Sequence, residues 1–146
     1  MADLPEKIED TVMAQLTGEQ RKLYLANQDR IAQQVQHREA GEFKKDKLKV
    51  LAELTKLRQI CCDPRLHYED YKAGSAKLDT CMELVHGALD GGHRILLFSQ
   101  FTGMLDIIGK RLAKEDIAFL KLTGASSKES RAKMVAQFQA GEVPAF

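Results

Sequence analysis

Two short polar turns carry the side chains in this sequence that are best suited to binding phosphate. Ser99, Gln100 and Phe101 follow one apolar run, and Thr123 and Gly124 follow a second. Each turn is predicted to precede a helix, whose first backbone N–H groups lack helical partners and attract anions. Because the carboxyl ends of parallel strands meet at one edge of a sheet, the two turns could together hold successive phosphates of a polynucleotide.

The polar groups of these turns have a second interpretation, as ordinary helix caps. Ser126 and Ser127 stand where a helix is predicted to begin, and serine is a favoured capping residue. Gly124 would let a ligand backbone approach closely, but glycine is also a common turn residue. The residues alone leave both interpretations open.

No pattern for nucleotide hydrolysis or another catalytic centre is found in the sequence. It lacks the loop G-x-x-x-x-G-K-[ST], an acidic pair after a buried strand, and any Ser/His/Asp or Cys/His constellation. No catalytic residue and no metal ligand are therefore predicted in this chain. Cys61, Cys62 and Cys81 form neither an even set nor a C-x-x-C pair, so they are predicted to be buried thiols on helix faces.

Apolar residues at helical spacing predict the elements that position these turns. Helices are predicted over residues 17–35, 47–63, 75–90, 102–114 and 126–139. Three of them have start signals: a capping box at residues 17–20, Ser75 as a cap, and a second capping box at residues 126–129. The polar residues 36–46 are predicted to form a loop. The predicted inward-facing positions are Tyr24, Gln28, Ile31, Val35, Val50, Leu54, Leu57, Cys61, Leu78, Met82, Val85, Leu89, Leu105, Ile108, Leu112, Met134, Val135 and Phe138.

Continuous apolar runs at residues 95–98 and 118–122 predict strands that are covered on both faces. A third strand is predicted to begin at residues 143–146, and a weaker one lies at residues 9–16. Strands that alternate with helices predict right-handed crossovers and a parallel sheet. The predicted class is α/β, a partial parallel sheet with flanking helices that follows a mostly helical region. Two strands and the start of a third are too few for a stable sheet. We therefore expect the sequence to stop inside a domain.

Composition narrows the possible partners. The 146 residues carry a net charge of +1, so nucleic-acid binding requires a local patch of basic side chains. No apolar run is long enough to span a bilayer, and the polar N-terminus does not resemble a signal peptide. We therefore expect no membrane partner and a location in the cytoplasm, associated with the nucleoid in a bacterium, or in the nucleus of a eukaryote.

Several blocks match a known pattern in order along nearly the whole chain. They are Leu4-Pro5 with Lys7 and Glu9; Leu16-Thr17 with Glu19, Gln20 and Tyr24; Leu54 to Pro64 with its Leu-Arg-Gln and doubled cysteines; Ser75 with Lys77 and Leu78; Arg94 to Phe101; and Leu122 and Gly124 with Arg131 and Phe138. Together they resemble the C-terminal RecA-like lobe of the Swi/Snf-type ATPases, the double-stranded-DNA translocases of helicase superfamily two. Residues 94–101 resemble helicase motif IV.

The resemblance implies a part of an ATP-driven motor that moves along duplex DNA and remodels bound chromatin or other nucleoprotein. It implies a helical and strand-containing start of the lobe over residues 1–74 and a truncated RecA-like lobe over residues 75–146. The implied partners are the duplex DNA backbone and the first RecA-like lobe of the same protein, with ATP and Mg²⁺ bound by the full-length protein. The DNA-backbone candidates are Ser99, Gln100, Phe101, Thr123, Gly124, Lys77 and Arg131.

Some parts of the family pattern are missing. Motif V would begin at the strand at Phe146, and motif VI with its arginine finger and the whole first lobe are absent. We therefore expect this chain to be inactive alone, to supply half of the ATPase cleft between the lobes, and to self-associate through an unpaired sheet edge. An RNA-helicase-type second lobe and a non-catalytic α/β interaction module remain alternatives. Lys77 has an alternative role as a solvated or packing lysine, and Arg131 as the partner of a helix carboxylate.

Overall fold

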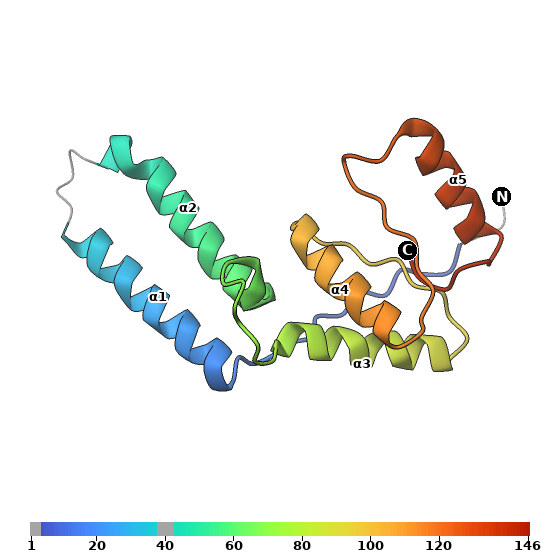
Figure 1. Cartoon of the computed structure of the whole chain (residues 1–146), viewed down its shortest axis with the longest axis horizontal. Coiled ribbons are helices and arrows are strands. Elements are labelled where there is room, and N and C mark those ends of the chain that lie inside the picture. Colours follow the sequence, from blue (N-terminus) through green and yellow to red (C-terminus); the bar gives the residue numbers. More distant parts are fainter. Residues whose placement is uncertain (1–3, 38–42) are drawn as a thin grey trace.

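A computed structural model describes residues 4–37 and 43–146, and its regular elements there are helical. They are α1 (Gly18–Gln36), α2 (Phe43–Cys62), the short 3-10 helix η1 (Pro64–Leu66), α3 (Ala76–Asp90), α4 (Thr102–Lys114) and α5 (Lys128–Gln139). Figure 1 shows α1 and α2 as a hairpin at one end, α3 and α4 in the middle, and α5 at the other end. The five predicted helices are confirmed.

The α1–α2 hairpin is less apolar inside than its sequence pattern predicts. Ile31 is buried, but Val35 and Leu54 are 37% and 46% exposed. Polar contacts tie the hairpin together instead, among them a 2.5 Å ion pair between Arg30 Nη2 and Glu53 Oε2. The predicted loop at residues 36–46 is too long, because α2 already begins at residue 43; residues 38–42 lie outside the described part of the chain.

A buried polar junction, here called the Gln20 junction, joins three helices. Gln20 is only 1% exposed. Its Nε2 donates to the carbonyl of Ile60 at 3.0 Å, and its Oε1 accepts from the N–H of Ala76 at 2.9 Å. Ser75 Oγ donates to the Cys62 carbonyl at 2.8 Å and accepts from the N–H of Leu78, which confirms the predicted cap. The start of α1 therefore fixes the end of α2 against the start of α3.

The predicted capping box at residues 17–20 is wrong, although the helix does begin there. Thr17 is the cap residue of α1 but makes no side-chain capping bond. The Gln20 side chain, which a capping box would turn back to the helix start, is used in the Gln20 junction instead. The second predicted capping box, at residues 126–129, is also wrong, because Ser127 and not Ser126 caps α5, by accepting from the N–H of Ser130.

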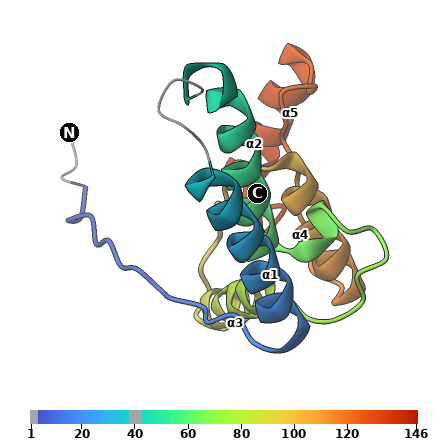
Figure 2. The same ribbon diagram turned by 90° about the vertical axis from the view of Figure 1, so that its left-hand side faces the viewer.

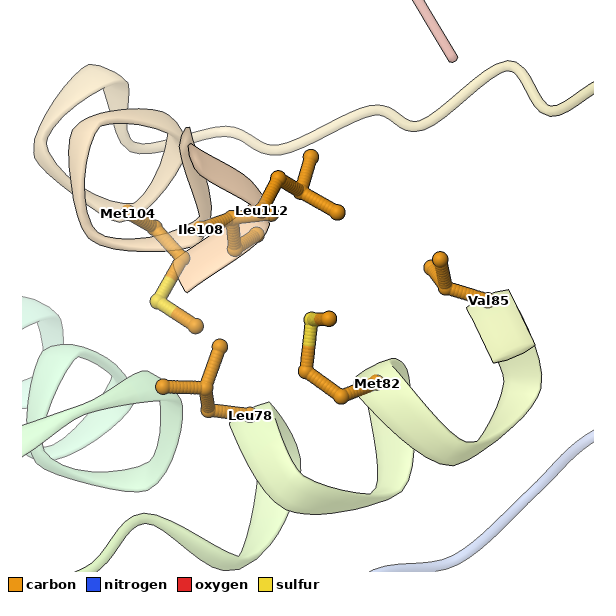
Figure 3. Close-up of a cluster of buried hydrophobic side chains, with 6 residues drawn as sticks. All are labelled: Leu78, Met82, Val85, Met104, Ile108 and Leu112. Carbon is orange, nitrogen blue, oxygen red and sulfur yellow. The ribbon is translucent and has the colours of Figure 1, made fainter. Parts of the chain in front are cut away.

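The apolar core lies between α3 and α4 (Figure 3). Every third or fourth residue of each helix faces the other, as the sequence pattern predicts. Each of these side chains is at most 6% exposed: Leu78, Met82 and Val85 from α3, and Met104, Ile108 and Leu112 from α4. Leu105 and Leu89, also predicted to face inward, are only partly buried.

Three extended segments pair in parallel, but only through single bridges. Ile95 and Phe119 each pair with Ala145, so residues 143–146 lie between the other two segments. The N–H of Ile95 donates to the Pro144 carbonyl at 2.8 Å, and that of Leu120 donates to the Ala145 carbonyl at 3.0 Å. Their parallel direction agrees with the predicted sheet. The predicted strands themselves are not formed in the described residues. Three backbone hydrogen bonds join residues 95–97 to residues 144–146, and one joins Leu120 to Ala145, but each side has only one bridge.

Two other strand predictions are wrong. Residues 4–16, here called the N-terminal arm, form no strand. The first part of the arm projects away from the helices in Figure 2, whereas Val12 and Ala14 line a pocket beside α3. The segment at residues 95–98 is not covered on both faces, since Leu96 and Phe98 are 55% and 87% exposed.

The predicted inward-facing residues of α5 are less buried than expected. Met134 is only partly buried and Val135 is 43% exposed, so this helix adds little to the core.

The exposed edge at residues 95–98 leads to a prediction about solution state. Substituting Phe98 by serine should reduce concentration-dependent self-association of this chain, because Phe98 is the most exposed aromatic side chain at an unpaired edge. Light scattering over a concentration series measures this. Leu48→Ser, which alters a 79% exposed residue of α2, is the control. A wild-type chain that stays monomeric at high concentration would contradict the prediction.

Candidate nucleic-acid interface

The turn at residues 99–101, here called the Ser99 turn, joins the edge segment to α4. Ser99 Oγ accepts from the N–H of Phe101 at 3.2 Å, so the hydroxyl shapes the turn and does not cap the helix. Phe101 precedes α4 and provides no side-chain cap. Gln100 is exposed, and its Oε1 accepts a hydrogen bond from Arg58 Nη2 of α2. This turn therefore touches the end of the α1–α2 hairpin.

The turn at residues 123–126, here called the Thr123 turn, is closed by its own polar groups. The N–H of Thr123 donates to Ser126 Oγ at 3.1 Å, and the N–H of Ser126 donates to the Thr123 carbonyl at 3.0 Å. Arg131 Nε and Nη2 donate to the carbonyls of Ser126 and Thr123, both at 3.0 Å. Arg131 thus fastens the turn, and the predicted alternative of a carboxylate partner is not what the structure shows. A Cβ added at Gly124 would meet no atom within 4 Å, which leaves its backbone open to a ligand.

A groove of about 690 Å³ runs between α2, α3 and the Ser99 turn. It brings four of the predicted residues together: Lys77, Ser99, Gln100 and Phe101. The other three, Thr123, Gly124 and Arg131, do not line it. Thr123 and Gly124 follow the segment that pairs on the far side of residues 143–146, and Arg131 lies on α5. The two turns therefore follow parallel segments at the same edge without sharing one cavity.

Both apolar and basic side chains line the groove. Its apolar lining includes Leu54, Leu57 and Met104, and its basic lining residues, Arg58 and Lys77, are both exposed. Within the described part of the chain, neither cation makes an ion pair with a carboxylate, whereas Arg30, Arg65 and Arg111 each do. The positive charge along the groove is therefore not paired with a carboxylate of residues 4–37 or 43–146.

All three cysteines of the chain line this groove. Burial raises the pKa of the Cys61 thiol, and the positive charge of Lys77 opposes that rise. Burial also raises the pKa of Cys81. Burial thus favours the protonated thiol at Cys61 and at Cys81. All three cysteines lie on helices, as predicted, but they are partly buried and not fully buried. No group of His, Cys, Asp or Glu that could hold a metal occurs in residues 4–37 and 43–146.

Arg58 is the groove residue that sequence reasoning missed. It stands in the Leu-Arg-Gln block of residues 57–59, where helical periodicity marks it only as a solvent-facing position. Its guanidinium carbon lies 6.0 Å from the centroid of the Phe101 ring. The two residues are 43 positions apart in sequence, so no local pattern indicates their contact.

Comparison with known proteins identifies relatives of the whole chain. Residues 76–146 match the family model described as helicase conserved C-terminal domain. The chain is 25% identical over 144 residues to an uncharacterized ATP-dependent helicase of Mycoplasma pneumoniae, covering 99% of this chain and 14% of the relative. It is 26% identical over 168 residues to the DNA repair and recombination protein RAD54-like of Drosophila erecta, covering 98% of this chain and 21% of the relative. The chain thus spans about a fifth or less of these relatives.

The fold is also similar to a solved structure. The SWI2/SNF2 ATPase C-terminal domain of Sulfolobus solfataricus superposes with a TM-score of 0.86 and 31% sequence identity. The match covers 96% of this chain and 62% of that domain. The likeness includes the α1–α2 hairpin as well as the region of the family model. It supports the predicted RecA-like α/β architecture, although the described residues themselves form bridges and not a complete sheet. The described residues contain no helix that is both long and apolar enough to cross a bilayer.

Proposed function

Because the chain belongs to the Swi/Snf-type helicase-like ATPases and corresponds to part of their C-terminal lobe, we propose that it supplies duplex-DNA backbone contacts to an ATP-driven translocase. The contacts lie along the groove at Lys77 and the Ser99 turn, and continue on the same edge to Thr123 and Gly124. The observation that carries this proposal is that Lys77 lines the same groove as the Ser99 turn and makes no ion pair with a carboxylate among the described residues. Arg131 serves by holding the Thr123 turn in shape.

The groove chemistry suits a phosphate backbone. Lys77 offers an ammonium group, and the side chains of Ser99 and Gln100 offer neutral polar groups in the same groove. Contacts of this kind position a duplex without reading its sequence. The names of the relatives support the rest of the proposal, since one is an ATP-dependent helicase and another is a DNA repair and recombination protein. In this reading the full-length protein remodels nucleoprotein in the bacterial nucleoid or the eukaryotic nucleus.

ATP and Mg²⁺ belong to other parts of such a protein. The chain has no phosphate-binding loop in its sequence, and its described residues group no His, Cys, Asp or Glu side chains for a metal. We therefore infer that this chain forms one wall of a cleft whose other wall is the first RecA-like lobe. Hydrolysis alone is not expected, because the groups that position the phosphates would come from that first lobe.

Duplex binding by Lys77 is testable with the chain as it exists. In fluorescence anisotropy at low salt, Lys77→Ala should weaken binding of a labelled DNA duplex about threefold and reduce the steepness of its salt dependence by about one. Lys114→Ala is the matched control, because Lys114 is the last residue of α4, at the end of that helix away from the Ser99 turn. Equal affinities for Lys77→Ala and Lys114→Ala would contradict the assignment, and a preference for duplex RNA would favour the RNA-helicase alternative.

The native cysteines show whether binding occurs in the groove. Cys61, Cys62 and Cys81 all line it, so bound duplex should slow their alkylation by N-ethylmaleimide, followed by mass spectrometry. Binding that leaves all three alkylation rates unchanged would place the DNA elsewhere.

The same preparation should show no duplex-stimulated ATP hydrolysis. Turnover that survives repurification would contradict the inferred need for the first lobe.

A further inference from the structure

We infer that Arg58 is an additional phosphate-binding residue of the groove, which Gln100 and Phe101 hold in place until a phosphate arrives. The inference rests on the proposed function and extends it to α2, a helix outside the RecA-like part of the fold. Arg58 Nη2 donates to Gln100 Oε1, and the guanidinium lies over the Phe101 ring with 6.0 Å between its carbon and the ring centroid. Both partners belong to the Ser99 turn.

The hydrogen-bonding capacity of Arg58 is mostly unused. A guanidinium has five N–H donors, and within the described residues Arg58 donates only to one neutral amide oxygen. Arg65, by contrast, donates to both carboxylate oxygens of Asp63. A phosphate would accept two charge-assisted bonds from Arg58, which are stronger than one bond to an exposed amide. Phosphate should therefore displace the Gln100 oxygen.

The Gln20 junction fixes Arg58 relative to Lys77. Gln20 bonds to the carbonyl of Ile60, two residues after Arg58, and to the N–H of Ala76, the residue before Lys77. The two cations thus stand on different helices, α2 and α3, whose ends are joined by a buried polar side chain. They line the same groove. A preformed pair of cations binds phosphate groups without first having to order the chain.

Phe101 keeps the guanidinium oriented while the amide is displaced. Arginine stacks on aromatic rings through its flat face, which leaves the N–H groups at its edge free to bond. The ring of Phe101 is partly buried against the α3–α4 core, so it is a firm platform. The geometry assigns Gln100 the role of a positioning residue for Arg58 in the free protein, in addition to any contact of its own.

The test is a set of variants in the anisotropy assay. Arg58→Ala should lower the affinity for duplex about fivefold and reduce the salt dependence by about one phosphate contact. Arg58→Lys should recover part of that loss, since it keeps the charge but not the paired donors. Arg21→Ala, an exposed arginine of α1 outside the groove, controls for the loss of one positive charge.

The role of Gln100 is tested by combining it with Arg58. If Gln100 acts through Arg58, the effects of Gln100→Ala and Arg58→Ala on affinity should not add in the double variant. Wild-type binding with cysteine protection, but unchanged affinity and salt dependence in Arg58→Ala, would overturn this inference and leave the proposed function standing. A wild-type chain that neither binds duplex nor protects its cysteines would overturn both.

Discussion

Replacing Gln20 by leucine is expected to lower the free energy of unfolding by about 3 kcal/mol, because it leaves buried backbone groups without partners. Leucine has a similar size but can neither donate to the Ile60 carbonyl nor accept from the N–H of Ala76. Because Gln20 is only 1% exposed, water cannot reach these backbone groups to replace the lost hydrogen bonds. Urea denaturation followed by circular dichroism, extrapolated to water, measures the change.

The control for this substitution is on the same helix. Gln28→Leu makes the same chemical change at an exposed position of α1 and should alter the free energy of unfolding by less than about 0.5 kcal/mol. Similar values for the two variants would mean that the Gln20 junction contributes nothing. Gln20→Leu should also weaken duplex binding by the molecules that remain folded, since the Gln20 junction sets the separation of Arg58 and Lys77.

Leu78→Ala is expected to lower the free energy of unfolding by about 3 kcal/mol, because it opens a cavity in the core between α3 and α4. Leu78 is 4% exposed and faces Met104 and Ile108 across the core. Leu84→Ala removes the same atoms from the same helix, at a position that is 55% exposed. That variant should cost less than about 1 kcal/mol, again by urea denaturation.

The comparison of these two leucine variants also tests whether this chain has a cooperative core. If both lower the free energy of unfolding equally, the α3–α4 contact in Figure 3 does not stabilise the protein in solution. A change in the slope of the unfolding curve with Leu78→Ala alone would indicate that the compactness of the unfolded or native state has changed.

The helices could be predicted because their signals are local. Leu78, Met82 and Val85 recur at the spacing of one helix face, and Ser75 caps the helix that they define. Such patterns need only the residues within a few turns of one another. Prediction from local patterns failed for Gln20. Its position fits a capping box, but its hydrogen-bonding partners lie 40 and 56 residues away in the sequence.

The candidate site could be predicted only in part. The positions of Ser99 and Thr123 after apolar runs correctly placed the two turns after parallel segments. Arg131 was expected to add charge for DNA or to pair with a carboxylate, but it bonds to the backbone carbonyls of the Thr123 turn. Arg58 had no local signal, because its contacts with Gln100 and Phe101 depend on how the α1–α2 hairpin packs against the Ser99 turn.

The middle position of residues 143–146 has a consequence for folding during synthesis. The hairpin contact between Arg30 and Glu53 spans 23 residues, whereas Ile95 pairs with Ala145 across 50 residues. Contacts between distant residues form more slowly, and the N-terminal part of a chain leaves the ribosome first. The hairpin and the α3–α4 core can therefore form while residues 95–98 and 119–120 still lack the segment that joins them. A nascent chain paused before residue 143 would display both flanking segments unpaired, and this interval is when chaperone binding would matter most.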